Sequence, residues 1–109
     1  MPKAIFTSGL RTPFGRSFKG AYRDVRADDL LVEMLQAQAS RSPELWNSGP
    51  EDLVVGCAYP EHEQGYNVGR VAALGVGLDV PGMVVNRLCA SSLEAVAVAA
   101  ARIEASWGT

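Results

Sequence analysis

Short apolar runs alternate with segments of helical periodicity along this chain, and that alternation is the strongest constraint on its fold. Residues 53–58, Leu-Val-Val-Gly-Cys-Ala, form a continuous apolar run, which predicts a strand buried on both faces. Residues 3–8 and 83–86 are shorter runs with β-favouring side chains, and we predict a strand at each. Three strands are therefore expected, each separated from the next by more than 20 residues.

A helix is predicted after each of these strands. The first begins at Asp28 and Asp29, whose carboxylates suit the positive end of the helix dipole, and ends before Pro43. A short helix is expected from Asn67 to Leu74, and a long Ala-rich helix from Cys89 or Ala90 to about residue 105. The apolar stripe expected to face the core in the long helix is Leu93, Val96, Ala97, Ala100 and Ile103.

The alternating order predicts an α/β fold with a parallel or mixed sheet and right-handed crossovers. A length of 109 residues allows one domain. Sheets covered by helices on both faces usually need a longer chain. We therefore expect an incomplete α/β/α layered domain.

Charge and composition exclude several functions. Ten basic and twelve acidic residues give a net charge of −2, which is no footprint for nucleic acid or an anionic membrane. No apolar run approaches the ~20 residues that a membrane span needs, and the N-terminal apolar stretch is too short for a signal peptide. The two cysteines lack CxxC or metal-site spacing, so we expect a reducing cytoplasm, no disulfide and no metal site. The early basic residues are interspersed with acids and predict a solvated face: Arg11, Arg16, Lys19, Arg23 and Arg26.

Cys89 is the candidate for chemistry. It lies between an apolar strand and the start of a helix, where unsatisfied N–H groups and the dipole favour a negatively charged sulfur. Small neighbours, Ala90, Ser91 and Ser92, allow close approach of a substrate, and the Cys89 N–H can donate to an oxyanion. From position alone, a buried structural cysteine remains the alternative.

Four ordered motifs resemble the thiolase family. Residues 85–96, Val-Asn-Arg-Leu-Cys-Ala-Ser-Ser-Leu-Glu-Ala-Val, are similar to its acyl-enzyme motif, and residues 11–15, Arg-Thr-Pro-Phe-Gly, to its opening signature. Gly56 ends the second predicted strand as in the family, and residues 64–70 resemble its Gln-Gly-x-Asn-x-Ala-Arg segment, with Gly69 in place of Ala. The match covers essentially the whole chain, residues 1–109, as the N-terminal portion of the thiolase N-terminal domain. It is most like bacterial 3-ketoacyl-CoA thiolases (acetyl-CoA acyltransferases) of fatty-acid β-oxidation.

The resemblance implies one catalytic residue, Cys89, which takes the acyl group of a 3-ketoacyl-CoA as a covalent thioester. Coenzyme A is then a substrate, and no bound cofactor is expected. The family's activating histidine, second cysteine and Asn-Glu-Ala-Phe or His-Glu-Ala-Phe segment have no counterpart here. His62 is expected to be a solvated loop residue, Cys57 to be packed, and Asn86 to hydrogen-bond backbone beside the nucleophile. Three further residues are expected to order a loop near the family's dimer interface: Gln64, Asn67 and Arg70.

Three functions are compatible with these residues. The first is the N-terminal piece of a 3-ketoacyl-CoA thiolase. The parent enzyme is then expected to be a homodimer or tetramer, and the piece is expected to have little activity on its own. The second is a non-catalytic assembly module that keeps half of the thiolase sheet and pairs through its exposed edge. The third is a decarboxylating ketoacyl synthase, against which the motifs at residues 11–15 and 86–89 argue.

Overall fold

A computed structural model gives the structure of the chain and describes residues 2–105. Its regular elements begin only after an extended N-terminal segment and a loop, which together occupy residues 2–26. The elements in chain order are α1 (Ala27–Arg41), α2 (Pro43–Asn47), β1 (Leu53–Gly56), η1 (His62–Gln64), α3 (Val68–Gly75), β2 (Gly82–Val85), η2 (Leu88–Ala90) and α4 (Ser91–Glu104), where η marks a 3-10 turn.

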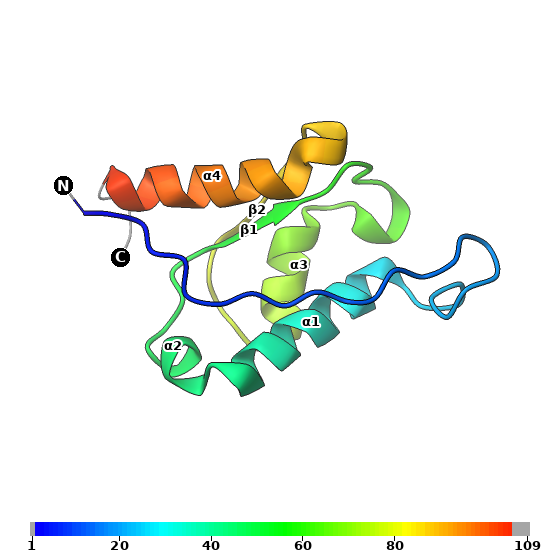
Figure 1. Ribbon diagram of the computed structural model, residues 1–109, viewed down its shortest axis with the longest axis horizontal. Helices are drawn as coiled ribbons and strands as arrows, with labels where there is room; N and C mark the ends of the chain where they lie inside the picture. Colours follow the sequence, from blue (N-terminus) through cyan, green and yellow to red (C-terminus); the bar gives the residue numbers. More distant parts are fainter. Residues whose placement is uncertain (1, 106–109) are drawn as a thin grey trace.

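The two strands form a parallel pair in which Leu53 lies opposite Gly82 and Gly56 opposite Val85. Helix α4 lies along one face of this pair, and α3 packs against the other, with α1 beyond it (Figure 1). The predicted α/β class with layered helices is confirmed. Since parallel strands carry their carboxyl ends at the same edge, the segments after Gly56 and Val85 begin side by side, and the Cys57 N–H donates to the Val85 carbonyl at 3.1 Å.

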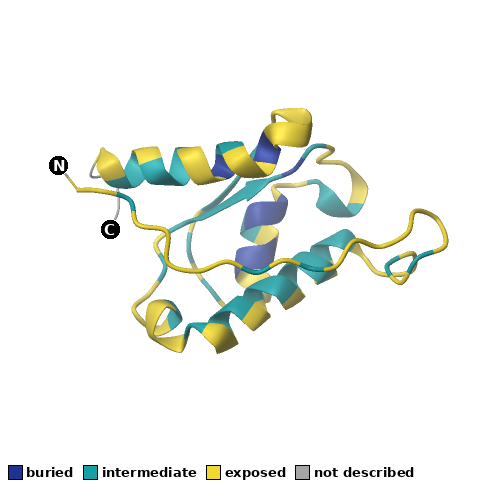
Figure 2. Cartoon of the chain, viewed as in Figure 1, coloured by how far each residue is buried: buried dark blue, intermediate teal, exposed yellow. Residues whose placement is uncertain are grey.

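The core is small and centres on α3. The buried residues of α3 are Val68, Gly69, Ala72 and Ala73, and this helix is dark blue over much of its length in Figure 2. Glycine allows this close packing: a Cβ on Gly69 would lie 2.7 Å from the Met83 carbonyl oxygen in β2. Helix α3 therefore rests directly on the sheet backbone.

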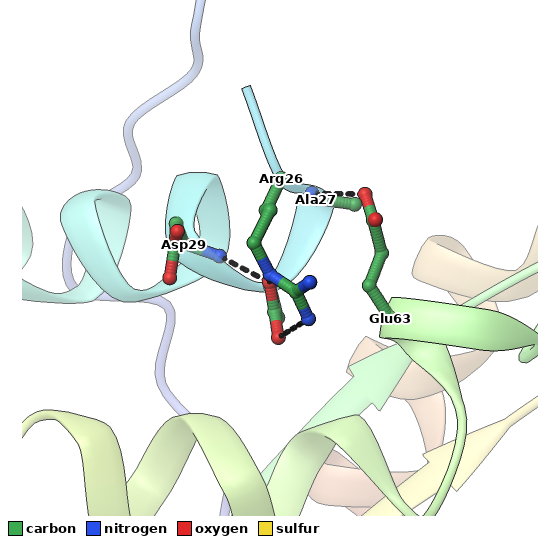
Figure 3. Close-up of polar contacts among 5 residues, drawn as sticks. Arg26, Ala27, Asp29 and Glu63 are labelled. Atoms are coloured by element: carbon green, nitrogen blue, oxygen red, sulfur yellow. Dashed lines mark hydrogen bonds and ion pairs between the residues drawn. The ribbon is translucent and has the colours of Figure 1, made fainter. Parts of the chain in front are cut away.

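Helix α1 begins where charged side chains satisfy its first turn (Figure 3). Arg26 donates from Nε and Nη2 to the two carboxylate oxygens of Asp28, each at 3.0 Å. The hydrogen bond from Arg26 lowers the pKa of Asp28 below its usual 3.8, and the same pair raises the pKa of Arg26. Glu63 reaches across from η1, and its Oε1 accepts the Ala27 N–H at 2.7 Å. The helix is thus capped from a segment 36 residues further along the chain.

The strand predicted at residues 3–8 is wrong. This segment has no strand geometry in the structure, and Ile5 and Phe6 are 79% and 77% exposed. It is tied to α1 and the residue after it by side-chain hydrogen bonds: Gln38 Nε2 donates to Ser8 Oγ, and Ser8 and Ser42 share a bond between their hydroxyls. A strand forms only where a neighbour pairs its backbone, and β1 pairs only with β2 among the described residues.

Two details of the packing also differ from prediction. Residues 53–56 are half-buried rather than enclosed on both faces, because one edge of β1 borders an open groove. The stripe predicted for α4 is wrong in part: Leu93, Val96 and Ala97 are exposed, while Ala100 and Ile103 are half-buried. The small residues Ser91 and Ala95 face the sheet instead, because they let the helix approach the strand closely. Helix α2 was not predicted.

Candidate active site

Cys89 lies in η2, the turn that joins the end of β2 to the start of α4. Its thiol is free and exposed, and the residue directly precedes Ala90, the N-cap of α4. The position predicted for Cys89, between a strand and a helix, is the one it occupies. A thiol at this point is open to a substrate and lies at the end of the helix that favours negative charge.

The turn before Cys89 is held in an unusual backbone conformation. Leu88 has a φ of +50°, in the left-handed region that residues with a Cβ seldom occupy. The Asn86 side chain supports it, because Oδ1 accepts the Leu88 N–H at 2.8 Å. The prediction that Asn86 hydrogen-bonds backbone beside Cys89 is confirmed.

Ser91 also contributes to this turn, although the sequence pattern indicated only that it is a small neighbour of Cys89. It is 3% exposed and belongs to the first turn of α4. Its Oγ accepts the Arg87 N–H at 2.9 Å and donates to the Leu88 carbonyl at 2.6 Å. The usual signal of a capping serine does not describe Ser91, because the N-cap of α4 is Ala90 and the hydroxyl of Ser91 bonds back to the preceding turn.

Arg87 and Glu94 form an ion pair across the base of the turn, with 3.2 Å between Nε and Oε2. The Arg87 side chain is 67% exposed, so the pair contributes little to stability. It does place one guanidinium on the surface two residues before Cys89.

The other residues considered from sequence lie apart from this turn. Cys57 is buried, as predicted, and lines a small pocket beneath α1 with Leu30 and Met34. His62 is an exposed residue of η1, in agreement with the solvated position expected for it. Among the described residues, no group of three or more His, Cys, Asp or Glu side chains could hold a metal ion.

The Gln64–Arg70 segment orders loops through hydrogen bonds to backbone. Gln64 donates to the Tyr59 carbonyl at 3.0 Å, and Asn67 donates to the Gly82 carbonyl at 2.8 Å. Arg70 binds the Val80 carbonyl and the Asp79 carboxylate at 2.5 and 3.0 Å. The loop-ordering role predicted for these three residues is confirmed by these contacts.

A separate groove of about 760 Å³ opens beside β1 and does not include Cys89 among its lining residues. Its walls come from α1, β1 and α4 and are mostly apolar, with Leu31, Val54 and Val96 among them. Arg102 and Asp52, which form an ion pair, lie at its polar end.

The geometry alone does not identify the protein family, whereas comparison with known proteins does. Residues 4–107 match the profile of the thiolase N-terminal domain. The chain belongs to the thiolase family. This confirms the resemblance expected from the sequence motifs.

Curated thiolases resemble the chain over nearly all of its length. It is 43% identical over 105 residues to a 3-ketoacyl-CoA thiolase of Cronobacter sakazakii, covering 94% of this chain and 27% of that protein. It is 45% identical over 106 residues to one of Saccharophagus degradans, covering 95% and 27%. A third, of Shewanella loihica, is 40% identical over 110 residues, covering 99% and 28%. The thiolase chain described here thus spans about a quarter of the length of these relatives.

The helices of this thiolase chain are short compared with the ~20 residues that cross a bilayer. Across residues 2–105, none is both long enough and apolar enough to cross a membrane. The longest, α1, has 15 residues and carries charged side chains.

Proposed function

We propose that this chain carries the acyl-accepting nucleophile of a 3-ketoacyl-CoA thiolase, Cys89, and forms the N-terminal portion of the thiolase N-terminal domain over residues 1–109. One observation carries the proposal: the Cys89 thiol is free and exposed on a tight turn between β2 and α4, within the segment that matches the family. The other cysteine, Cys57, is buried and has no comparable access.

The proposed reaction proceeds in two steps. The Cys89 sulfur attacks the keto carbon of a 3-ketoacyl-CoA and loses its proton to a base. The bond between C2 and C3 then breaks, leaving an acyl thioester on Cys89 and the enolate of acetyl-CoA, which takes up a proton. In the second step the thiol of coenzyme A attacks this thioester, which releases the shortened acyl-CoA and returns the proton to Cys89.

The substrate class follows from the relatives, whose names describe 3-ketoacyl-CoA thiolases. Coenzyme A is thereby proposed as a substrate and not as a resident cofactor. A degradative role in fatty-acid metabolism, a cytoplasmic location and a homodimeric or tetrameric parent enzyme belong to the same proposal.

We expect the 109-residue chain alone to turn over substrate very slowly. The base for the thiol, the donor for the enolate and part of the oxyanion hole belong, by the family resemblance, to segments with no counterpart here. Loss of a single oxyanion donor reduces turnover by about 100- to 1,000-fold.

The test is to incubate the chain with acetoacetyl-CoA and read each cysteine by mass spectrometry, together with thiolysis by absorbance. The expected result is a trace acetyl adduct on Cys89, absent from Cys89→Ser, and turnover at least about 100-fold below a full-length thiolase. An adduct on Cys57 instead, or full turnover by Cys89→Ser, would contradict the proposal.

An assembly module is the second candidate function, and the open groove beside β1 favours it. One edge of β1 has no paired strand among the described residues, and such edges pair readily with other chains. The occupant would be a second copy of this chain. Light scattering on a sizing column separates the two cases: a discrete dimer supports assembly, and a monomer contradicts it.

A further inference from the structure

Ser91 is buried although the proposed acyl transfer makes no use of it. It is the one polar residue among the buried side chains of residues 2–105. Burying a hydroxyl costs free energy unless its hydrogen bonds are made. Its partners therefore indicate what it does in the fold.

All of those partners lie in the three residues before Cys89. The Ser91 Oγ accepts the Arg87 N–H at 2.9 Å and donates its own proton to the Leu88 carbonyl at 2.6 Å. Asn86 Oδ1 lies 3.5 Å from the same oxygen and accepts the Leu88 N–H. The two side chains thus hold the peptide groups on both sides of Leu88, whose φ of +50° needs such support.

The base of this arrangement is fixed by the sheet. A Cβ on Gly56 would lie 2.4 Å from the Ser91 carbonyl carbon and from the Ser92 nitrogen. The first turn of α4 therefore sits directly on the backbone of β1 and cannot move closer. Ser91 links this fixed point to the turn that carries Cys89.

We propose that Ser91 is a positioning residue for Cys89: its buried hydroxyl holds residues 86–88 in the turn that presents the thiol at the start of α4. The proposal rests on the proposed function only in assigning Cys89 as the nucleophile. The position of the turn is a property of this chain and can be measured without substrate.

The experiment compares Ser91→Ala, Ser91→Thr and Ser92→Ala in the 109-residue chain. Ser92 is the matched control, because it is the adjacent serine but is exposed. Amide exchange of Arg87 is followed by NMR, and iodoacetamide alkylation of Cys89 and Cys57 by mass spectrometry. Cys57 is buried, so its protection reports whether each variant remains folded.

In Ser91→Ala, the Arg87 amide is expected to exchange about tenfold faster, because its acceptor is gone. Cys89 is expected to alkylate about two- to fivefold more slowly, as the thiol leaves its place beside the helix dipole. Cys57 stays protected. Ser91→Thr keeps the hydroxyl and should restore both rates, and Ser92→Ala should match the unmodified chain.

Unchanged Arg87 exchange and Cys89 alkylation in Ser91→Ala would overturn the proposal. So would loss of Cys57 protection in that variant, because Ser91 would then support the whole fold and not the turn. Acetylation of Cys89 by acetoacetyl-CoA is read in parallel. If no variant is acetylated but Ser91→Ala still changes the exchange and alkylation rates, the nucleophile assignment fails and the positioning role stands.

Discussion

At the scale of single residues, a glycine can shape the site as much as a reactive side chain does. Gly56 ends β1 with the backbone of Ser91 and Ser92 directly above it, and a Cβ there would approach three of their atoms to within 2.5 Å. All three are backbone atoms, so no side chain can rotate away to make room. The contact sets how closely α4 lies on the sheet and hence where Cys89 is held.

Gly56→Ala is therefore expected to lower the free energy of unfolding by about 1–3 kcal/mol, the usual cost of overpacking a tight contact. Urea denaturation followed by circular dichroism gives this difference. Gly9→Ala is the matched control, because the nearest atom to its added Cβ, on the Phe6 ring, is 3.7 Å away. Equal stability of the two variants would show that α4 moves freely on β1.

The sequence was informative for some residues of the candidate site and silent for others. Cys89 and Asn86 were predicted through a motif, and the structure places both at one turn. Ser91 was missed because its role depends on the left-handed φ of Leu88, which brings two peptide groups within reach of one hydroxyl. Nothing in the local pattern predicts a positive φ at a leucine.

At the scale of elements, α1 is stabilised by a residue from outside itself. Its N-cap, Arg26, makes no side-chain capping bond, and the Ala27 N–H is satisfied by Glu63. Glu63→Ala should cost about 0.5–2 kcal/mol of unfolding free energy, the range for losing a helix cap. Thermal unfolding measures it, with Glu61→Ala as control, since Glu61 is an exposed acid of the same loop. A loss as large in the control would assign the effect to net charge.

The Arg26–Asp28 pair gives α1 a dependence on pH. The hydrogen bond from Arg26 lowers the pKa of Asp28 in the folded chain below 3.8. Because the pKa of this carboxyl is lower in the folded chain, the ion pair stabilises the fold at pH values above the carboxyl pKa of the unfolded chain. That stabilisation is lost as the pH falls through the carboxyl pKa of the folded chain. The effect is small, because the Arg26 side chain is 59% exposed.

Asp28→Asn should accordingly lower the melting temperature slightly at neutral pH, and its difference from the parent chain should shrink as the pH falls below 3.8, because the carboxyl of the parent chain then also becomes protonated. Melting temperatures measured from about pH 2 to about pH 7 test this. Asp29→Asn, one residue along the same helix turn, is the control. A constant difference between Asp28→Asn and the parent chain over the whole range would exclude the ion pair as its source.

Helices were more predictable than strands for a physical reason. Helices α1, α3 and α4 make their hydrogen bonds locally, so their periodicity and caps in the sequence predicted them. A strand needs a neighbouring strand supplied by distant sequence. Residues 3–8 have β-favouring side chains, but no strand among residues 2–105 pairs with their backbone. For α4 the face was partly wrong because close packing favoured Ser91 and Ala95 over the larger Leu93.

At the scale of the whole molecule, the groove beside β1 is an apolar surface that the described residues leave open. Val54 and Val96 line it from the sheet and from α4, and Val96 is 47% exposed. Open apolar surface of this kind binds apolar dyes and marks contact surfaces. The uncharged dye Nile red should therefore bind to the chain with enhanced fluorescence.

Val96→Glu should weaken that binding by about tenfold or more, because a carboxylate in an apolar groove loses its hydration when the dye covers it. Leu93→Glu is the matched control: it adds the same charge one turn earlier on α4, at a residue that is 75% exposed and does not line the groove. Titration of the dye against each variant gives the affinities. If the two variants weaken binding equally, the dye responds to overall charge or to loosened packing, and the groove is not its site. If only Val96→Glu weakens it, and the same variant abolishes a dimer seen by light scattering, the groove is also the surface through which two copies of the chain associate.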